Sequence, residues 1–174
     1  INANGSVLLF GDNTLQKLTF NNTGSNATGF LRTFAVNSAT GAGSRGVLTI
    51  GSGGVVATSS NVTSLSVIEG RVDFGANPNV IDVAPVSGGG FADVDPLRAS
   101  LALQAVVGSA GGITKLGAGV IQFNAQSSFR GAFTVAEGGV KTGVINAGSR
   151  QSTLVLNAGT RFDLNNLGTT WGGL

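Results

Sequence analysis

The chain has 174 residues, of which 29 are glycine and 3 are proline, and its hydrophobic fraction is 41%. Collagen is excluded because it needs glycine at every third position, and intrinsic disorder is disfavoured because it needs low hydrophobicity. Charged residues make up 10% of the chain and the net charge is +2, so nucleic acid is not an expected partner.

Short apolar stretches alternate with Asn- and Gly-rich turns along the first half of the chain. Such stretches predict β-strands, and the alternation within them (Leu48 with Ile50, Val72 with Phe74) directs one face of each strand into a core. The expected strands are Ser6–Phe10, Leu15–Phe20, Phe30–Val36, Val47–Ile50, Val55–Ala57, Leu65–Ile68 and Arg71–Phe74.

Residues 87–107 allow two interpretations. Asp95 as an N-cap, with Pro96 at the first helical position, would begin a helix. However, Leu101 and Leu103 belong to an alternating apolar pattern, which favours a strand from Ser100 onward. We expect that strand, preceded by a loop over residues 87–98.

The most informative stretch runs from Gly111 to Val140. It reads GGITKLGAGVIQF, then a polar turn, and then FRGAFTVAEGGV. This order predicts strands separated by glycine turns, with about ten residues in each strand–turn unit. A chain that repeats such units builds a solenoid or a sandwich more often than an enzyme with a pocket.

This stretch resembles the autotransporter-associated β-strand repeat, also called the passenger-associated transport repeat. The typical form of that repeat is G-G-L-T-K-x-G-x-G-T-L-x-L, an Asn- and Ser-rich turn, and then Y-x-G-x-x-x-V-x-x-G-x-L. Val120 and Phe123 occupy apolar positions of the repeat, and Phe129 stands where the family usually carries Tyr. Residues 46–55 and 157–174 are similar to it more weakly. The resemblance implies an all-β fold, a right-handed parallel β-helix (β-solenoid), exported to the bacterial cell surface or beyond, and it implies no chemistry.

We therefore expect one β-solenoid domain over residues 1–174, as a segment of a longer or processed chain. At roughly twenty residues per coil, the chain would form about eight coils and a rod about 40 Å long. In the last third, Phe133 and Leu156 are expected to be buried in the core, and Ile145–Gly148 and Leu156–Gly159 are expected to form corners.

Catalytic, cofactor and metal sites are not expected. The chain has neither histidine nor cysteine, which removes the Ser-His-Asp arrangement and the usual ligands of zinc and iron. Gly41–Gly46 matches the G-x-G-x-x-G pattern, but the β-rich segment Val47–Ile50 follows it, where phosphate binding requires a helix.

Three acidic residues, Asp82, Asp93 and Asp95, could bind Ca²⁺ or form a carboxylate pair for glycoside cleavage. A solvated loop, with Asp95 capping or turning the chain before Pro96, is the favoured interpretation. The basic residues Arg130, Lys141, Arg150 and Arg161 could line one face for an anionic glycan, but scattered solubilising charge is favoured. Trp171 and the phenylalanines could stack on sugars, although alternating phenylalanines are typical of a core.

Three classes of function stay open. The leading one is a non-enzymatic extracellular structural protein, a rod in a cell-surface or matrix fibre that associates with copies of itself because its terminal coils are uncapped. The alternatives are an adhesin that binds a glycan or a cell surface and, less favoured, a β-helical polysaccharide lyase or hydrolase. No apolar run is long enough to span a bilayer, so this segment is not expected to insert into a membrane.

Overall fold

The computed structural model describes residues 1–2, 5–22, 30–34, 46–60, 65–87, 98–169 and 171–174. These residues form strands and turns and contain no helix. In chain order the strands are β1 (Ser6–Phe10), β2 (Asn13–Leu15), β3 (Leu18–Asn22), β4 (Phe30–Phe34), β5 (Leu48–Ile50), β6 (Val55–Ser59), β7 (Ser66–Asp73), β8 (Asn79–Val83), β9 (Ala99–Gly108), β10 (Ile113–Leu116), β11 (Val120–Phe123), β12 (Phe133–Val135), β13 (Gly139–Thr142), β14 (Leu154–Leu156) and β15 (Arg161–Asp163).

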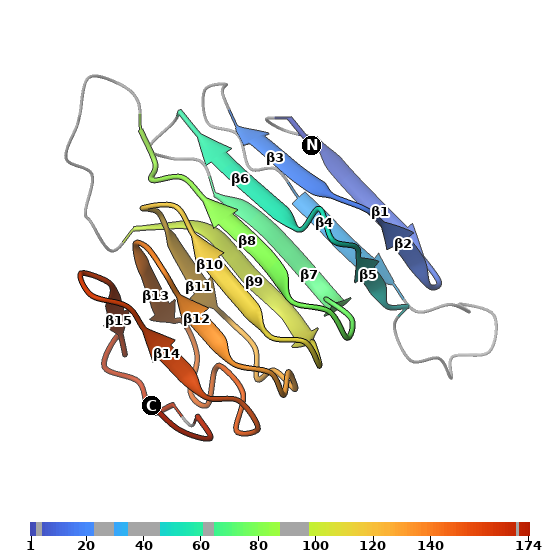
Figure 1. The fold of residues 1–174 in the computed structure, drawn as a ribbon. Coiled ribbons are helices and arrows are strands. Elements are labelled where there is room, and N and C mark those ends of the chain that lie inside the picture. The colour runs from blue at the N-terminus through green and yellow to red at the C-terminus, as the bar shows by residue number, and fades with distance from the viewer. Residues whose placement is uncertain (3–4, 23–29, 35–45, 61–64, 88–97, 170) are drawn as a thin grey trace.

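Two parallel sheets face each other (Figure 1). One has nine strands, in the order β1-β4-β7-β9-β11-β13-β15 with β2 and β5 beside this path, and the other has six, in the order β3-β6-β8-β10-β12-β14. From β6 onward, consecutive strands alternate between the sheets, so each circuit of the chain adds one strand to both. The two termini lie at opposite ends of the resulting stack (Figure 1). The prediction of an all-β fold is confirmed at this level.

The circuit is short and regular only in the C-terminal half. Ile113 pairs with Phe133, 20 positions later, and Phe133 pairs with Leu154, 21 positions later. In the N-terminal half, Leu18 pairs with Val55, 37 positions later. In the described residues the path of the larger sheet has seven strands and the smaller sheet has six, so the stack has six to seven coils, fewer than the expected number of about eight.

Inward-pointing side chains stack in columns because the strands are parallel and in register. Ile68, Leu103 and Phe123 form one such column, and each is at most 1% exposed. Phe133 is fully buried, as predicted. Leu156 is in register with the buried Val135, but it is 37% exposed because β14 is the last strand of its sheet. The prediction that Leu156 is buried is therefore wrong.

Several strand predictions are confirmed and others need correction. β1 has the predicted bounds, and β9 confirms the strand over Ser100, so the helix interpretation of its residues is wrong. β4 forms the first part of the strand expected at 30–36, and residues 35–36 lie outside the described ranges. The strand predicted at 15–20 is divided between β2 and β3. The two strands predicted at 65–68 and 71–74 are the single strand β7.

Gly70 lies within β7, between the two stretches that were predicted as separate strands. It has a φ of 101°, which residues with a side chain rarely adopt, and it still pairs with Ala105 of β9, so the strand continues through this glycine. The predicted corners contain left-handed backbone at Asn146, with φ 59°, and at Gly148 and Gly159, with φ 92° and 80°. The sequence analysis did not identify a further corner, where Asn165 and Asn166 have φ 49° and 55°.

Replacing Phe133 with Ala should lower the free energy of unfolding by about 3–5 kcal/mol, because the ring is fully buried between two sheets. Ile145→Ala is the control, since Ile145 is 66% exposed and its truncation should cost less than about 0.5 kcal/mol. Urea unfolding followed by circular dichroism measures both. Equal stabilities for the two variants would contradict the core assignment.

Gly131→Ala tests how closely the turns of successive coils approach. A Cβ on Gly131 would lie 2.1 Å from the backbone nitrogen of Gly112, where only a shift of the backbone can make room. We expect a loss of about 1–3 kcal/mol in unfolding free energy. Gly168→Ala is the matched control, because nothing lies within 4 Å of the added methyl group. A Gly131 variant as stable as this control would refute the close approach.

Candidate functional site

The acidic residues do not form a described site. Asp93 and Asp95 lie outside the described residues, and Asp82 lies on β8 with its side chain partly exposed. In the described part of the chain, no three carboxylate side chains group in a way that could hold a metal ion.

The glycine-rich pattern at residues 41–46 is described only at Gly46. A strand, β5, follows it, as the sequence analysis expected. A Cβ on Gly46 would lie 1.9 Å from the carbonyl oxygen of Gly11, so the close approach of two backbone segments explains this glycine.

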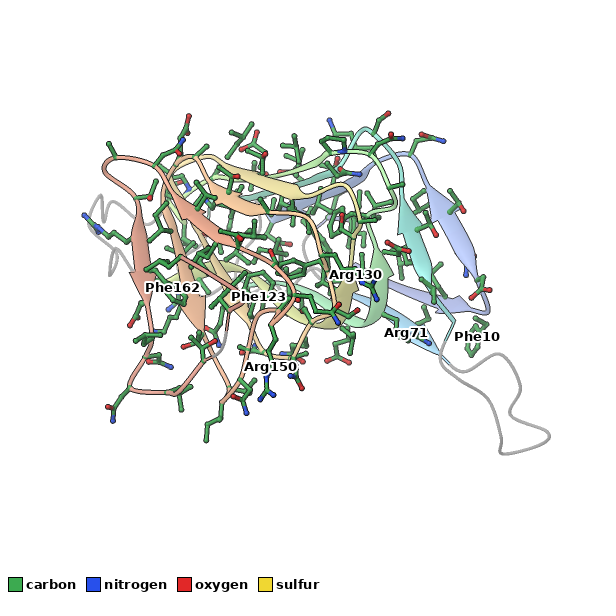
Figure 2. The ribbon with its side chains drawn as sticks, turned by 60° about the horizontal axis from the view of Figure 1, so that its bottom comes forward. Phe10, Arg71, Phe123, Arg130, Arg150 and Phe162 are labelled. Carbon is green, nitrogen blue, oxygen red and sulfur yellow. The ribbon has the colours of Figure 1, made fainter. Side chains whose placement is uncertain are left out.

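The four basic residues of the C-terminal half are spread over different elements. Arg130 and Arg150, labelled in Figure 2, precede β12 and β14. Lys141 lies on β13 and Arg161 on β15. Lys141 Nζ lies 3.7 Å from the Asp163 carboxylate, and Arg130 Nε donates a hydrogen bond of 3.1 Å to the side-chain oxygen of Gln151. Two of the four therefore have neighbours within the protein, and the four do not form one stripe.

The aromatic residues pack against one another inside the C-terminal coils. The ring centroid of Trp171 lies 6.2 Å from that of Phe123, 5.7 Å from that of Phe129 and 5.9 Å from that of Phe133. Phe162 contacts the same indole at 6.2 Å. Phe123, Phe129 and Phe133 are buried in the core, and Trp171 and Phe162 are partly buried against it, so the packing of the protein itself accounts for these rings.

Lys115 is the most unusual polar residue of the described chain, and the sequence analysis did not single it out. It is fully buried, and it pairs with Ile81 on one side and Val135 on the other, both of which are fully buried. Its side chain therefore occupies a position of the apolar column. The ammonium donates hydrogen bonds to the carbonyl oxygens of Gly117 and, at 3.0 Å, of Glu137.

Hydrogen bonds of Lys115 and Glu137 join two successive coils. Gly117 follows β10 and Glu137 follows β12, so the ammonium connects the turns of successive coils. The Glu137 carboxylate completes the connection by accepting a hydrogen bond of 3.1 Å from the backbone N–H of Gly117. Burial lowers the pKa of Lys115 from its ordinary 10.5 to about 8, although the Glu137 and Asp82 carboxylates raise it.

The outermost strands of the described stack carry the remaining candidate surface. At the C-terminal end, three leucines on or after the last strands are exposed. Leu156 is 37% exposed, Leu164 is 47% exposed and Leu174 is 87% exposed. At the N-terminal end, Leu8 is 50% and Phe10 69% exposed. Figure 2 shows Phe10 and Phe162 near opposite ends of the molecule. These ends present strand edges and apolar side chains, which are features of an interaction surface.

No protein-family model matches the chain, and no curated protein or solved structure matches it. The described residues include no helix of the length and apolar character that crossing a bilayer requires.

Lys115 should make stability depend on pH in an alkaline window. The unfolded chain holds this proton up to pH 10.5, but the folded chain loses it near pH 8. Between these values the unfolded state binds more protons, so the free energy of unfolding rises with pH, by up to about 3 kcal/mol. Lys115→Met removes this rise, and Lys17→Met, at an exposed position, is the control.

The measurement is urea unfolding of the three proteins between pH 7 and pH 10. The difference in unfolding free energy between the wild type and Lys115→Met should grow across this range, whereas the difference for Lys17→Met should stay constant. Parallel curves for the wild type and Lys115→Met would show that the lysine is not desolvated as its burial indicates.

Proposed function

We propose that this chain is a non-enzymatic structural rod of the bacterial cell surface or extracellular matrix, built as a right-handed parallel β-helix. The observation that carries the proposal is the alternation of consecutive strands between two wholly parallel sheets, with pairing positions about twenty residues apart in the C-terminal half. Such a stack grows by repetition of one unit and forms a stiff, elongated body.

A general rule supports the right-handed winding of the proposed β-helix. A connection between two parallel strands of one sheet is right-handed in about 98% of cases, because of the right-handed twist of the strands. Every circuit of this chain is such a connection, since it leaves one strand, passes through the opposite sheet and returns to a parallel neighbour.

The proposed relationship to the autotransporter-associated β-strand repeat is supported by the places that its motif residues take. Gly112, Gly117 and Gly138, three glycines of the repeat phrase, have φ of 85°, 75° and 67°. The apolar positions Val120 and Phe123 are buried on β11. Export to the cell surface follows from this relationship as part of the proposal, and self-association of the rod is proposed from the strand edges of its terminal coils.

A non-enzymatic role is supported by what the polar and aromatic groups do. Lys115 connects two turns, Lys141 lies beside Asp163, and Trp171 packs against phenylalanine rings. In the described part of the chain, each of these side chains contacts other residues of the protein. They do not converge on one point where a substrate could react.

A distance measurement tests the rod. The chain has no cysteine, so Ser6→Cys and Asp163→Cys, two positions that the strand register places in one column, would carry the only two spin labels. Six strand steps separate β1 from the last strand of the nine-stranded sheet, which gives about 30 Å along the stack at ~4.8 Å per step. Pulsed electron resonance should find one narrow distribution near that distance. A broad distribution, or turnover of a polysaccharide by the purified chain, would contradict the proposal.

A further inference from the structure

Each circuit of the chain turns at two corners between the sheets, and at one of them the buried serines have partners. At this corner, which leads from the nine-stranded sheet to the six-stranded sheet, serine hydroxyls donate to carbonyl oxygens of the preceding coil. Ser109 donates to Gly75 at 3.3 Å, and Ser149 donates to Phe129 at 2.6 Å. Both serines are buried, so the chain itself satisfies these polar groups.

The opposite corner, which leads from the six-stranded sheet to the nine-stranded sheet, holds three other buried polar residues. Asn22 ends β3, Ser59 ends β6 and Ser66 begins β7. Asn22 and Ser66 are 0% exposed and Ser59 is 5% exposed. Asn22 and Ser59 are strand partners, and the Asn22 Nδ2 donates a hydrogen bond of 2.9 Å to Ser66 Oγ. These three residues, the polar corner, therefore lie together inside the stack.

Ser66 interrupts a column of the core that is otherwise apolar. Its strand partner is Leu101, Leu101 also pairs with Ile121, and Ile121 pairs with Val140. These three apolar residues are fully buried. Serine lacks the outer carbon atoms of leucine and isoleucine, a difference about the size of one water molecule. The column is therefore both smaller and more polar at Ser66 than in the coils that follow.

The Asn22 amide is incompletely hydrogen-bonded within the described part of the chain. Its Oδ1 is buried and has no partner there. Ser66 can satisfy only one of the two polar atoms of the amide, so the other needs a partner whichever way the amide is turned. Ser66 Oγ accepts the bond from Asn22 and still has its own proton to donate. Folded proteins seldom leave buried polar atoms unpaired, because the desolvation is then not compensated.

Two further buried atoms of the described residues have no partner, and neither is in contact with the polar corner. Ser100 Oγ lies one coil further on, where the register between β9 and β11 shifts. Trp171 Nε1 lies in the last coil, among phenylalanine rings. The polar corner differs from both because it brings three buried polar side chains together.

We propose that the polar corner binds one water molecule inside the stack, between Asn22 and Ser66. The water donates a hydrogen bond to Asn22 Oδ1 and accepts one from the Ser66 hydroxyl. The Ser59 hydroxyl, on the strand beside Asn22, is the third group, and about three hydrogen bonds are typical of a buried water. The water thus joins β3 of one sheet to β7 of the other. This inference goes beyond the proposed rod and does not depend on it.

The chemistry of the polar corner favours water over a metal ion. Its side-chain oxygens belong to one amide and two hydroxyls, which carry no charge, whereas Ca²⁺ and Mg²⁺ are bound mainly through carboxylates. Taking an ion out of water into a buried site without a counter-charge is costly. Water also donates to Asn22 and accepts from Ser66 at the same time, and a cation cannot accept a hydrogen bond.

High-resolution crystallography of the full chain is the direct test. We expect one peak of electron density about 2.8 Å from both Asn22 Oδ1 and Ser66 Oγ. A hydrogen bond from another residue directly to Asn22 Oδ1, with no density between Asn22 and Ser66, would overturn the inference.

NOESY and ROESY spectra test the site in solution. A bound water should give cross-peaks to the Asn22 side-chain amide and to the Ser66 backbone amide, with opposite signs in the two spectra because it tumbles with the protein. Ser109→Ala, at the other corner, is the control and should keep both cross-peaks. The double variant Asn22→Leu with Ser66→Val continues the apolar column and should lose the cross-peak at position 66. Its retention would contradict the site.

A change of salt separates water from a monovalent cation. The Tm of the wild type should be the same in sodium, potassium and choline chloride at equal ionic strength. A Tm that falls in choline chloride and is restored by sodium or potassium would identify a cation as the occupant and overturn the inference. Circular dichroism checks the fold of the variants, and the crystal structure and spectra of the wild type decide the question even where the double variant does not fold.

Discussion

Hydrogen bonding between successive coils is the interaction on which the rest of this structure depends. In the interior of the stack, each strand pairs with the coil before it and the coil after it, which satisfies its backbone donors and acceptors. The same register aligns inward side chains, so that Ile68, Leu103 and Phe123 bury one another although they lie on three separate circuits. A single coil has almost no core of its own, and stability arises only when neighbours are stacked.

The turns must stack as closely as the strands, and this requirement explains residues that have no apolar side chain. Gly131 lies over Gly112 with no room for a methyl group. Lys115 fills a core column with its aliphatic stem and carries its ammonium to the carbonyls of Gly117 and Glu137. Burying this charge costs free energy and lowers the pKa of Lys115, and the Glu137 and Asp82 carboxylates offset part of that cost, so the pKa falls only to about 8.

The sequence predicted the fold best where the circuit is shortest. Between Gly111 and Val140 the strands repeat every 20 positions or so, and local patterns are sufficient to place them. In the N-terminal half, residues inserted between strands hide the period, so the number of coils was overestimated. Lys115 was missed because a lysine indicates a surface, yet its position two residues after Ile113 on the same strand face was a usable signal. The exposure of Leu156 depends on where the stack ends, which no local pattern contains.

The ends of the stack differ physically from its sides. The sides present outward side chains such as Thr114 and Thr134, which water can solvate. The ends present the edges of two parallel sheets together with side chains of the inward columns, of which Leu164 is 47% exposed. A strand edge of this kind can pair with a further parallel strand, whichever segment supplies it, so the outermost coils are less completely buried than the coils between them.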